Sequence, residues 1–287
     1  MQSVMSKGRA DVVPAPLPSQ TSEPIPQDSS TPDPLIPSIR TQEESPLSGP
    51  SSQDSAVEVN PVPEALTMML QQIDQAASNE NLDGVMRFYS RNLQHSDGIS
   101  TRELKAMLTE FWSTYENLNY STEVTDWQTT DTGFVTTTVT TVTGQTDYGS
   151  RPLSFEAMVE SRQVILDLQI VEQEVLEESS QISLGQSPPT VEVNLPGTVR
   201  PGETFYFDAI VIEPIGRSLL MGTAFSDPVS LDTYRTVPSL DVGILEAGGL
   251  FKEGSAPSKP GQEWVSGLVF REDGVTGVTQ RLRIIND

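Results

Sequence analysis

The sequence predicts an α+β domain at residues 61–185, followed by an all-β domain at residues 186–287 and preceded by a disordered tail at residues 1–60. Three observations divide the chain in this way. Residues 1–60 contain 10 Pro and 12 Ser but no aromatic residue. Residues 61–185 begin with apolar patterns of helical period and continue with patterns of period two. Residues 186–287 contain short strand patterns between turn residues, an arrangement typical of an immunoglobulin-like β-sandwich.

The tail has too few large apolar side chains to offset the conformational entropy that ordering it would cost. Its closely spaced prolines favour extended stretches of polyproline type. Residues 1–13 contain Lys7 and Arg9 but no apolar segment like that of a secretory signal. We therefore interpret residues 1–60 as a flexible tether; the alternative is a dispensable tail.

Three helices are predicted at the start of the α+β domain. Apolar residues between Leu66 and Ala77 recur at helical spacing, and a shorter pattern runs from Leu82 to Tyr89. A loop is expected from Asn92 to Ile99. Ser100 and Glu103 then match a capping box, in which each side chain binds the backbone N–H of the other residue. A third apolar stripe follows, from Leu104 to Tyr115.

From Leu118 onward the period of the pattern is two, which predicts strands for the rest of the chain. The predicted strands of the α+β domain are antiparallel and cover residues 118–127, 134–145, 153–166 and 168–176. Those of the all-β domain cover residues 190–195, 205–212, 219–224, 240–245, 264–271 and 277–285, with Asp273 and Gly274 as a hairpin turn.

The composition excludes several classes of function. The chain has 17 basic and 40 acidic residues, a net charge of −23, so nucleic-acid binding is not expected because phosphate contacts need clustered Lys and Arg. There is no Cys, which removes thiol nucleophiles and cysteine metal sites. No apolar run is long enough to cross a membrane. The acidic surface favours basic partners.

The order of elements in residues 61–185 resembles the nuclear transport factor 2-like (SnoaL-like) superfamily. Phe88–Ser90, His95–Gly98 and the long last strand Ile170–Glu178 carry this resemblance. It implies a cone in which a strongly bent antiparallel sheet wraps the three helices, often with a pocket at its mouth. The superfamily includes isomerases, cyclases and dehydratases as well as non-catalytic binding modules, so the fold does not decide the function.

Residues 190–287 are similar to a module that follows such a domain in uncharacterised exported proteins of photosynthetic bacteria. The phrases Pro189–Pro196, Phe207–Val211, Ala247–Lys252 and Val278–Arg283 carry this likeness. Together with the tether, it predicts an extracytoplasmic location, in the periplasm or a lumen, with a signal or anchor that is not in this sequence. The alternative is a cytoplasmic protein.

His95 and Asp97 are the first candidates for a site. His95 is the only His of the chain and lies in the polar stretch expected to form a loop. A neighbouring carboxylate would raise the pKa of the imidazole and orient the ring for proton transfer or hydrogen bonding. The alternative is a loop that His95 fixes structurally, with Asp97 and Gly98 making the turn.

Four more residues are candidates for ligand binding: Tyr89, Trp112, Tyr115 and Arg162. Trp112 and Tyr115 could equally be core residues at helical spacing, and Arg162 could pair with Glu172 or Glu174 across strands. Further groups of the right type for acid–base chemistry are Tyr120, Asp126, Asp147 and Glu160, although spacing does not bring them together. The acidic pairs are expected to be solvated surface charge rather than metal ligands.

We therefore expect a non-catalytic, two-module protein that binds a protein partner or a small apolar ligand, without a cofactor or a metal. A homodimer through the sheet of the α+β domain is a further expectation. The alternative is an isomerase, hydratase or cyclase that acts in the cone, with His95 and Asp97 or a strand carboxylate as acid and base.

Overall fold

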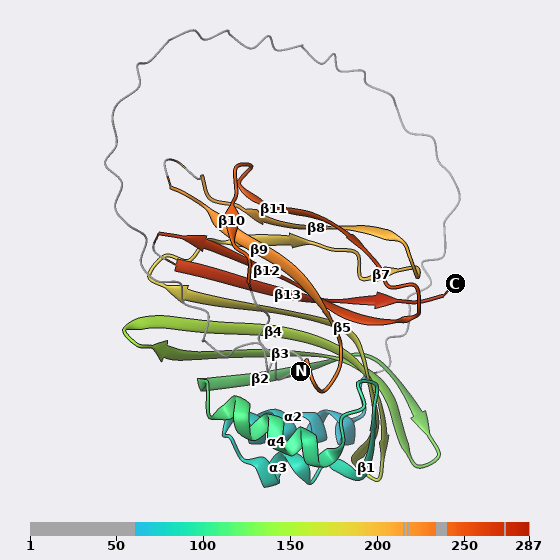
Figure 1. Cartoon of the computed structure of the whole chain (residues 1–287). Coiled ribbons are helices and arrows are strands. Elements are labelled where there is room, and N and C mark those ends of the chain that lie inside the picture. Colours follow the sequence, from blue (N-terminus) through green and yellow to red (C-terminus); the bar gives the residue numbers. More distant parts are fainter. Residues whose placement is uncertain (1–60, 215, 217, 234–239, 273, 287) are drawn as a thin grey trace, which may run out of the picture. The chain divides into compact units, whose positions relative to one another are not determined.

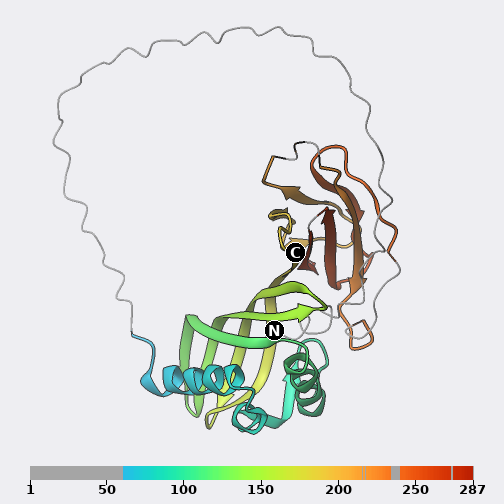
Figure 2. The ribbon, with the colours of Figure 1, turned by 90° about the vertical axis from the view of Figure 1, so that its left-hand side faces the viewer.

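The structure is a computed structural model that describes residues 61–214, 216, 218–233, 240–272 and 274–286. The tether predicted at residues 1–60 lies outside this part of the chain. Within it, helices lie against one face of a large, mainly antiparallel sheet (Figures 1 and 2). The α+β class with an antiparallel sheet is thus confirmed. Among the described residues, no helix has the length and apolar character needed to cross a bilayer.

The three predicted helices are present. They are α2 (Glu64–Ser78), α3 (Leu82–Met86) and α4 (Thr101–Trp112). The capping box of α4 forms as predicted, because the Ser100 hydroxyl accepts from the Glu103 N–H at 3.3 Å and the Glu103 carboxylate accepts from the Ser100 N–H at 2.8 Å. The helix ends at Trp112, earlier than predicted, so Tyr115 lies just beyond it.

The loop predicted from Asn92 to Ile99 is wrong for its first half. Tyr89–His95 forms strand β1, which runs parallel to β5 (Gln169–Gly185). The turn expected near His95 begins only after this strand. A parallel pairing between segments so far apart in sequence has no local signal, and β1 lacks the alternation that marks a half-buried strand.

Four long antiparallel strands follow the helices, as predicted. They are β2 (Glu116–Thr130), β3 (Gly133–Tyr148), β4 (Arg151–Leu166) and β5. The pairing of β4 with β5 shifts register twice, between Glu160 and Ser161 and between Val164 and Ile165. Such bulges bend strands locally.

The sheet continues beyond β5 into the C-terminal part of the chain. β13 (Gly274–Ile284) pairs with β5, and β12 (Gly261–Arg271), β9 (Met221–Pro228) and β10 (Gly243–Ile244) follow in that order. β7 (Thr198–Val199) pairs with the end of β13. The ten strands therefore form one sheet across the predicted boundary at residue 185, and the position of that boundary stays a prediction.

A second sheet has three strands, β11 (Gly249–Ser255), β8 (Thr204–Val211) and β6 (Val191–Asn194). β7 and β11 are absent from the sequence prediction. Side chains of β8 such as Phe207 form a buried cluster with Val265 and Val269 of β12 and with Leu282 of β13. A separate and larger cluster contains the buried side chains of the helices and of β2 to β5.

Helix α2 covers the free edge of β2. The Asp74 carboxylate accepts from the Thr122 N–H at 2.8 Å, and the Ser78 hydroxyl accepts from the Tyr120 N–H at 2.9 Å. These contacts satisfy backbone groups that an edge strand would otherwise leave open to pairing with another chain. Burial raises the pKa of Asp74, and its hydrogen bonds with Thr122 oppose that rise.

The capping box generates a first prediction. Ser100→Ala removes the acceptor for the Glu103 N–H, so we expect the free energy of unfolding to fall by about 1 kcal/mol. Urea denaturation measures this change. Ser150→Ala, in the exposed turn between β3 and β4, is the control and should change stability by less than about 0.5 kcal/mol. Equal effects of the two substitutions would contradict a stabilising role for the cap.

Candidate functional site

Strands β2 to β5 present one face to the helices, which we call the inner face; the opposite one is the outer face. Phe155 of β4 lies on the inner face, where its ring centroid is 5.3 Å from that of Phe111 and 5.0 Å from that of Tyr115. Residues directly opposite each other on paired strands share a face. The strand register therefore assigns the other inner-face residues.

A band of polar side chains crosses the middle of the inner face. Two adjacent rows of the register define it, Thr136–Gln163–Gln173–His95 and Thr138–Ser161–Val175. We call the six polar members of these rows the polar band. Five of them, all but His95, are between 0% and 7% exposed. An apolar row, Phe134–Ile165–Ile170, lies on one side of the band. On the other side the next row is Thr140–Val159–Glu178, and the apolar row Tyr120–Val142–Ala157 follows it.

Four buried atoms of the polar band have no hydrogen-bond partner among the residues that the structure describes. They are His95 Nε2, Thr138 Oγ1, Gln163 Oε1 and Gln173 Oε1. Leaving one buried polar group unpaired costs about 1–3 kcal/mol. Buried polar atoms in native proteins are nearly always paired with protein atoms or with an ordered molecule such as water. These four atoms in adjacent rows can therefore form hydrogen bonds with a bound molecule.

The turn after β1 fixes the tautomer of His95. The Asp97 N–H donates to His95 Nδ1 at 3.1 Å, so Nδ1 carries no proton and the neutral ring carries its proton on Nε2. Burial lowers the pKa of His95 to about 4, and the positive charge of Arg281 acts in the same direction. The nearby carboxylates of Asp97 and Glu178 oppose this shift. At neutral pH, His95 is therefore an uncharged hydrogen-bond donor.

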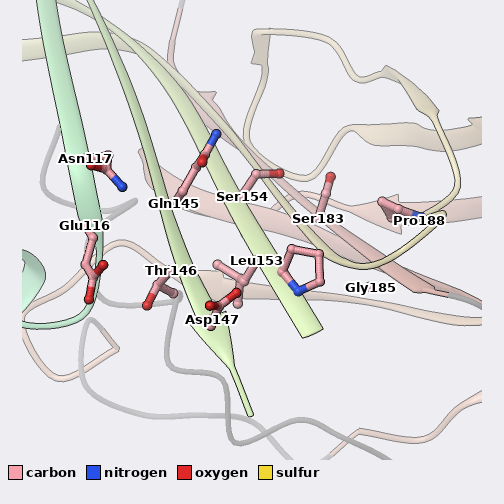
Figure 3. A pocket seen from close by; sticks show the side chains of 11 residues that line it. Glu116, Asn117, Gln145, Thr146, Asp147, Leu153, Ser154, Ser183, Gly185 and Pro188 are labelled. Carbon is pink, nitrogen blue, oxygen red and sulfur yellow. The ribbon is translucent and has the colours of Figure 1, made fainter. Parts of the chain in front are cut away.

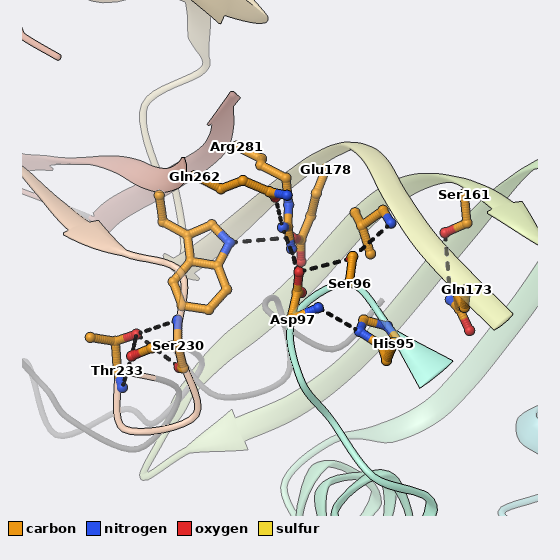
Figure 4. A network of polar contacts seen from close by, with 12 residues as sticks. His95, Ser96, Asp97, Ser161, Gln173, Glu178, Ser230, Thr233, Gln262 and Arg281 are labelled. Carbon is orange, nitrogen blue, oxygen red and sulfur yellow. Dashed lines mark hydrogen bonds and ion pairs between the residues drawn. The ribbon is translucent and has the colours of Figure 1, made fainter. Parts of the chain in front are cut away.

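A buried ion cluster lies beside His95 (Figure 4). The Arg281 guanidinium of β13 donates to both carboxylate oxygens of Asp97, at 3.0 and 2.9 Å. It also donates to Glu178 Oε2 of β5, from Nε at 3.0 Å and from Nη2 at 2.7 Å. Gln262 accepts from Arg281, and the Trp264 indole donates to Glu178 at 3.2 Å. The three charged side chains are 1–2% exposed.

The His95–Asp97 pair differs from the expectation. The Asp97 backbone, rather than its carboxylate, contacts the ring, while the carboxylate binds Arg281 and the Ser96 hydroxyl. Burial acts to raise the pKa of Asp97, but the hydrogen bonds and charge of Arg281 outweigh it and hold that pKa below its ordinary value. At neutral pH, the Asp97 carboxylate is therefore ionised and forms an ion pair with Arg281.

The other predicted binding residues do not converge on the polar band. Tyr89 lies at the opposite end of β1 from His95, and burial together with the charge of Asp74 raises its pKa to about 12. Trp112 is buried and donates to the Tyr120 hydroxyl at 2.9 Å. Tyr115 packs in the aromatic core. Arg162 alternates with the inner-face residues of β4 and so lies on the outer face.

The strand carboxylates considered for catalysis also lie elsewhere. Asp126, Asp147 and Glu160 all belong to register positions of the outer face. Asp147 lines a polar groove of about 360 Å³ near Glu116, Ser154 and Pro188 (Figure 3). In β3 the polar band lies at Thr136 and Thr138, whereas the groove begins at Gln145, near the end of the strand, so the two are separate sites. Among the described residues, no group of three or more acidic or His side chains is arranged to hold a metal ion.

Sequence reasoning missed most of the polar band and all of the ion cluster beyond Asp97. One signal was available: in β4, Ser161 and Gln163 interrupt an otherwise apolar alternation that includes Phe155, Val159 and Ile165. Polar residues at core positions of a strand point to function. Arg281 has no comparable signal, because its partners are 103 and 184 residues away in sequence.

Comparisons with known proteins add one family and several structural neighbours. A family model described as "Domain of unknown function (DUF8623)" matches residues 186–285. No curated protein matches the chain.

The structural neighbours have nuclear transport factor 2-like folds, the superfamily named by the sequence resemblance. An LEH-like epoxide hydrolase from Mycobacterium tuberculosis is 13% identical, with a TM-score of 0.27, over 39% of this chain and 80% of that one. A Delta 5-3-ketosteroid isomerase from Mycobacterium sp. is 10% identical, with a TM-score of 0.27, over 39% and 91%. An NTF-2 like protein of unknown function from Burkholderia xenovorans LB400 is 15% identical, with a TM-score of 0.24, over 39% and 81%.

The environment of His95 gives a second prediction. Because this is the only His of the chain, proton NMR reports its ring directly, and we expect a titration midpoint near pH 4 instead of 6.5. The unfolded chain binds this proton at higher pH than the folded chain. Stability is therefore full above pH 6.5 and falls as the pH decreases towards 4, by up to about 3 kcal/mol. His95→Gln should remove this fall, whereas a midpoint near 6.5 in the folded protein would contradict the buried, neutral ring.

Proposed function

We propose that this protein is a non-catalytic binding protein whose inner sheet face binds a small neutral ligand. In this proposal, the helices and β2 to β5 form the cone of the nuclear transport factor 2-like superfamily, and the polar band lies in its interior. The observation that carries the proposal is the set of four buried polar atoms that have no hydrogen-bond partner in the described part of the chain. A ligand that pairs with these atoms would recover the free energy that their isolation costs the protein.

The chemistry of the band defines the ligand class. His95 Nε2–H donates, the amide oxygens of Gln163 and Gln173 accept, and the Thr138 hydroxyl does either. The ligand should be uncharged, because a buried ionised group needs an opposite charge and the neighbouring Asp97 and Glu178 already bind Arg281. The apolar row Phe134–Ile165–Ile170 beside the band favours a ligand that also has an apolar part. This refines the expected small apolar ligand.

The alternative of an isomerase, hydratase or cyclase has less support. A general base needs a free lone pair within reach of a substrate and a pKa near the working pH. His95 Nδ1 accepts from the Asp97 N–H, and Asp97 has its pKa lowered and binds Arg281. These two residues therefore suit recognition better than proton transfer.

The remaining expectations concern the fold of the C-terminal part, the binding partners of the protein and its location. We infer that β6, β8 and β11 form a β-sandwich with β9, β12 and β13, since residues of β8, β12 and β13 share one buried cluster. A protein partner, a homodimer through the sheet of the α+β domain and an extracytoplasmic location stay predictions.

Two substitutions on the same face of β3 test the unpaired state of the band. Thr138→Val replaces a buried hydroxyl that has no partner among the described residues, so we expect the unliganded protein to gain about 1 kcal/mol of stability. Thr136→Val is the matched control: its hydroxyl donates to the Asp126 carbonyl at 2.9 Å, so the same change should cost about 1 kcal/mol. Urea denaturation measures both. If Thr138→Val destabilises as much as Thr136→Val, the hydroxyl is already satisfied and the proposal loses its main support.

Ligand binding is tested with a panel of neutral fragments that carry hydroxyl or amide groups, screened by saturation-transfer NMR against the full chain. We expect binders whose signal is lost with Gln163→Leu, because this substitution removes the amide and keeps the apolar volume. Arg162→Leu, the neighbouring residue on the outer face, is the control and should retain them. A panel in which no fragment distinguishes the two variants would overturn the proposed site.

A further inference from the structure

A single side chain from the C-terminal part of the chain holds the turn that presents His95. Arg281 lies on β13, and Asp97 lies 184 residues earlier, in the turn after β1. The two parallel N–H···O bonds between them, at 3.0 and 2.9 Å, fix the carboxylate in orientation as well as in position. Figure 4 shows Arg281 next to Glu178 and above the Asp97 carboxylate, with the His95 ring close to the Asp97 backbone N–H.

The turn itself is tied to β5 at two points. The Ser96 N–H donates to the Gln173 carbonyl at 2.9 Å, and the Ser96 hydroxyl accepts from the Val175 N–H at 3.2 Å. The same hydroxyl donates to Asp97 Oδ1 at 3.0 Å. Since the Asp97 N–H also holds His95 Nδ1, the orientation of the imidazole depends on where Asp97 is held.

We propose that Arg281 is a positioning residue for the inner-face site: it clamps Asp97 so that the His95 Nε2–H points towards the ligand. The site therefore needs residues from both sides of residue 185, and the C-terminal part of the chain completes it. This inference rests on the proposed function in calling the inner face a ligand site, but the clamp itself is a property of the free protein.

A second observation supports a shared site. Trp264 of β12 is 0% exposed and belongs to the buried cluster of the helices, rather than to the cluster of the C-terminal strands. Val229 and Leu231, also from the C-terminal part, pack against the same cluster. The Trp264 indole then binds Glu178, the other carboxylate that Arg281 holds. The segment matched by the family of unknown function thus supplies core, charge and hydrogen bonds to the neighbourhood of His95.

The geometry requires Arg at this position. The three nitrogens of one guanidinium donate to two carboxylates and to the Gln262 side chain. A Lys ammonium keeps the positive charge but lacks the fork that binds both oxygens of Asp97. Arg281→Lys therefore separates the role of the clamp from the role of the charge.

The experiment compares Arg281→Lys with Arg283→Lys in the full chain. Arg283 lies two positions further along β13 and pairs with Glu174 of β5 at 3.2 Å, so it is the same substitution on the same two strands, away from the turn. Two quantities are measured without any ligand: the NMR titration midpoint of His95 and the hydrogen exchange of the Asp97 amide. The charged groups around the ring, Asp97, Glu178 and position 281, keep their charges in both variants.

We expect Arg281→Lys to speed exchange of the Asp97 amide at least about tenfold and to raise the His95 midpoint by about one pH unit or more towards 6.5, because a loosened turn exposes the ring to water. Arg283→Lys should leave both values as in the unchanged protein. If Arg281→Lys also leaves them unchanged, only the charge matters and the positioning role is refuted. Should Arg281→Lys fail to fold, Asp97→Asn, which keeps the Arg281–Glu178 pair, is measured for exchange of the same amide.

The fragments from the inner-face screen complete the test. Fragments that bind the unchanged protein should bind Arg281→Lys at least about tenfold more weakly and Arg283→Lys equally well. A loosened turn with unchanged fragment binding would refute the link between Arg281 and the site. The absence of any inner-face binder would refute the proposed function while leaving the measured clamp intact.

Discussion

The buried contact of Arg281 with Asp97 and Glu178 is the constraint on which the site depends. Burying three charges costs several kcal/mol per ion unless geometry and further hydrogen bonds compensate. Here the compensation comes from Ser96, Gln262 and Trp264 as well as from the ion pairs. Such a cluster contributes little net stability compared with an apolar core, but it tolerates few arrangements of its partners. It therefore fixes where the turn after β1 meets β5 and β13.

In the proposed function, the inner face gives up part of its stability for binding. The apolar rows around Phe155 and Ile165 pack with the helices, as a folding core requires. We expect the polar band between them to lower stability, because Thr138, Gln163 and Gln173 bury polar atoms that have no partner among the described residues. Natural proteins keep such local violations where binding needs them. The bulges of β4 and β5 flank the same region and adjust which side chains face inward.

Local sequence patterns predicted most elements because their causes are local. Helical spacing from Leu66 and the capping box at Ser100 depend on residues within one or two turns, and the strands β2 to β5 depend on alternation within each segment. The failure at β1 has a different cause: this strand is held by β5, through register pairs such as Tyr89 with Ile170 and His95 with Gln173, which are far apart in the sequence. The interruption of β4 by Ser161 and Gln163 is the one part of the site that a local pattern could have revealed.

The sequence by itself determined the α+β class, the three helices and four long antiparallel strands of residues 61–185 without β1, the acidic charge and the presence of a single His, His95. These features follow from the composition and from local patterns, periodicity and capping, which depend only on residues close together in the sequence. Only the tertiary structure decided that His95 is neutral with its proton on Nε2, that Asp97 belongs to Arg281 rather than to His95, and that one sheet joins both parts of the chain. The physical reason is that burial and ion pairing depend on which distant segments meet, and the free energy of a charged group is set by those neighbours rather than by its own position in the sequence.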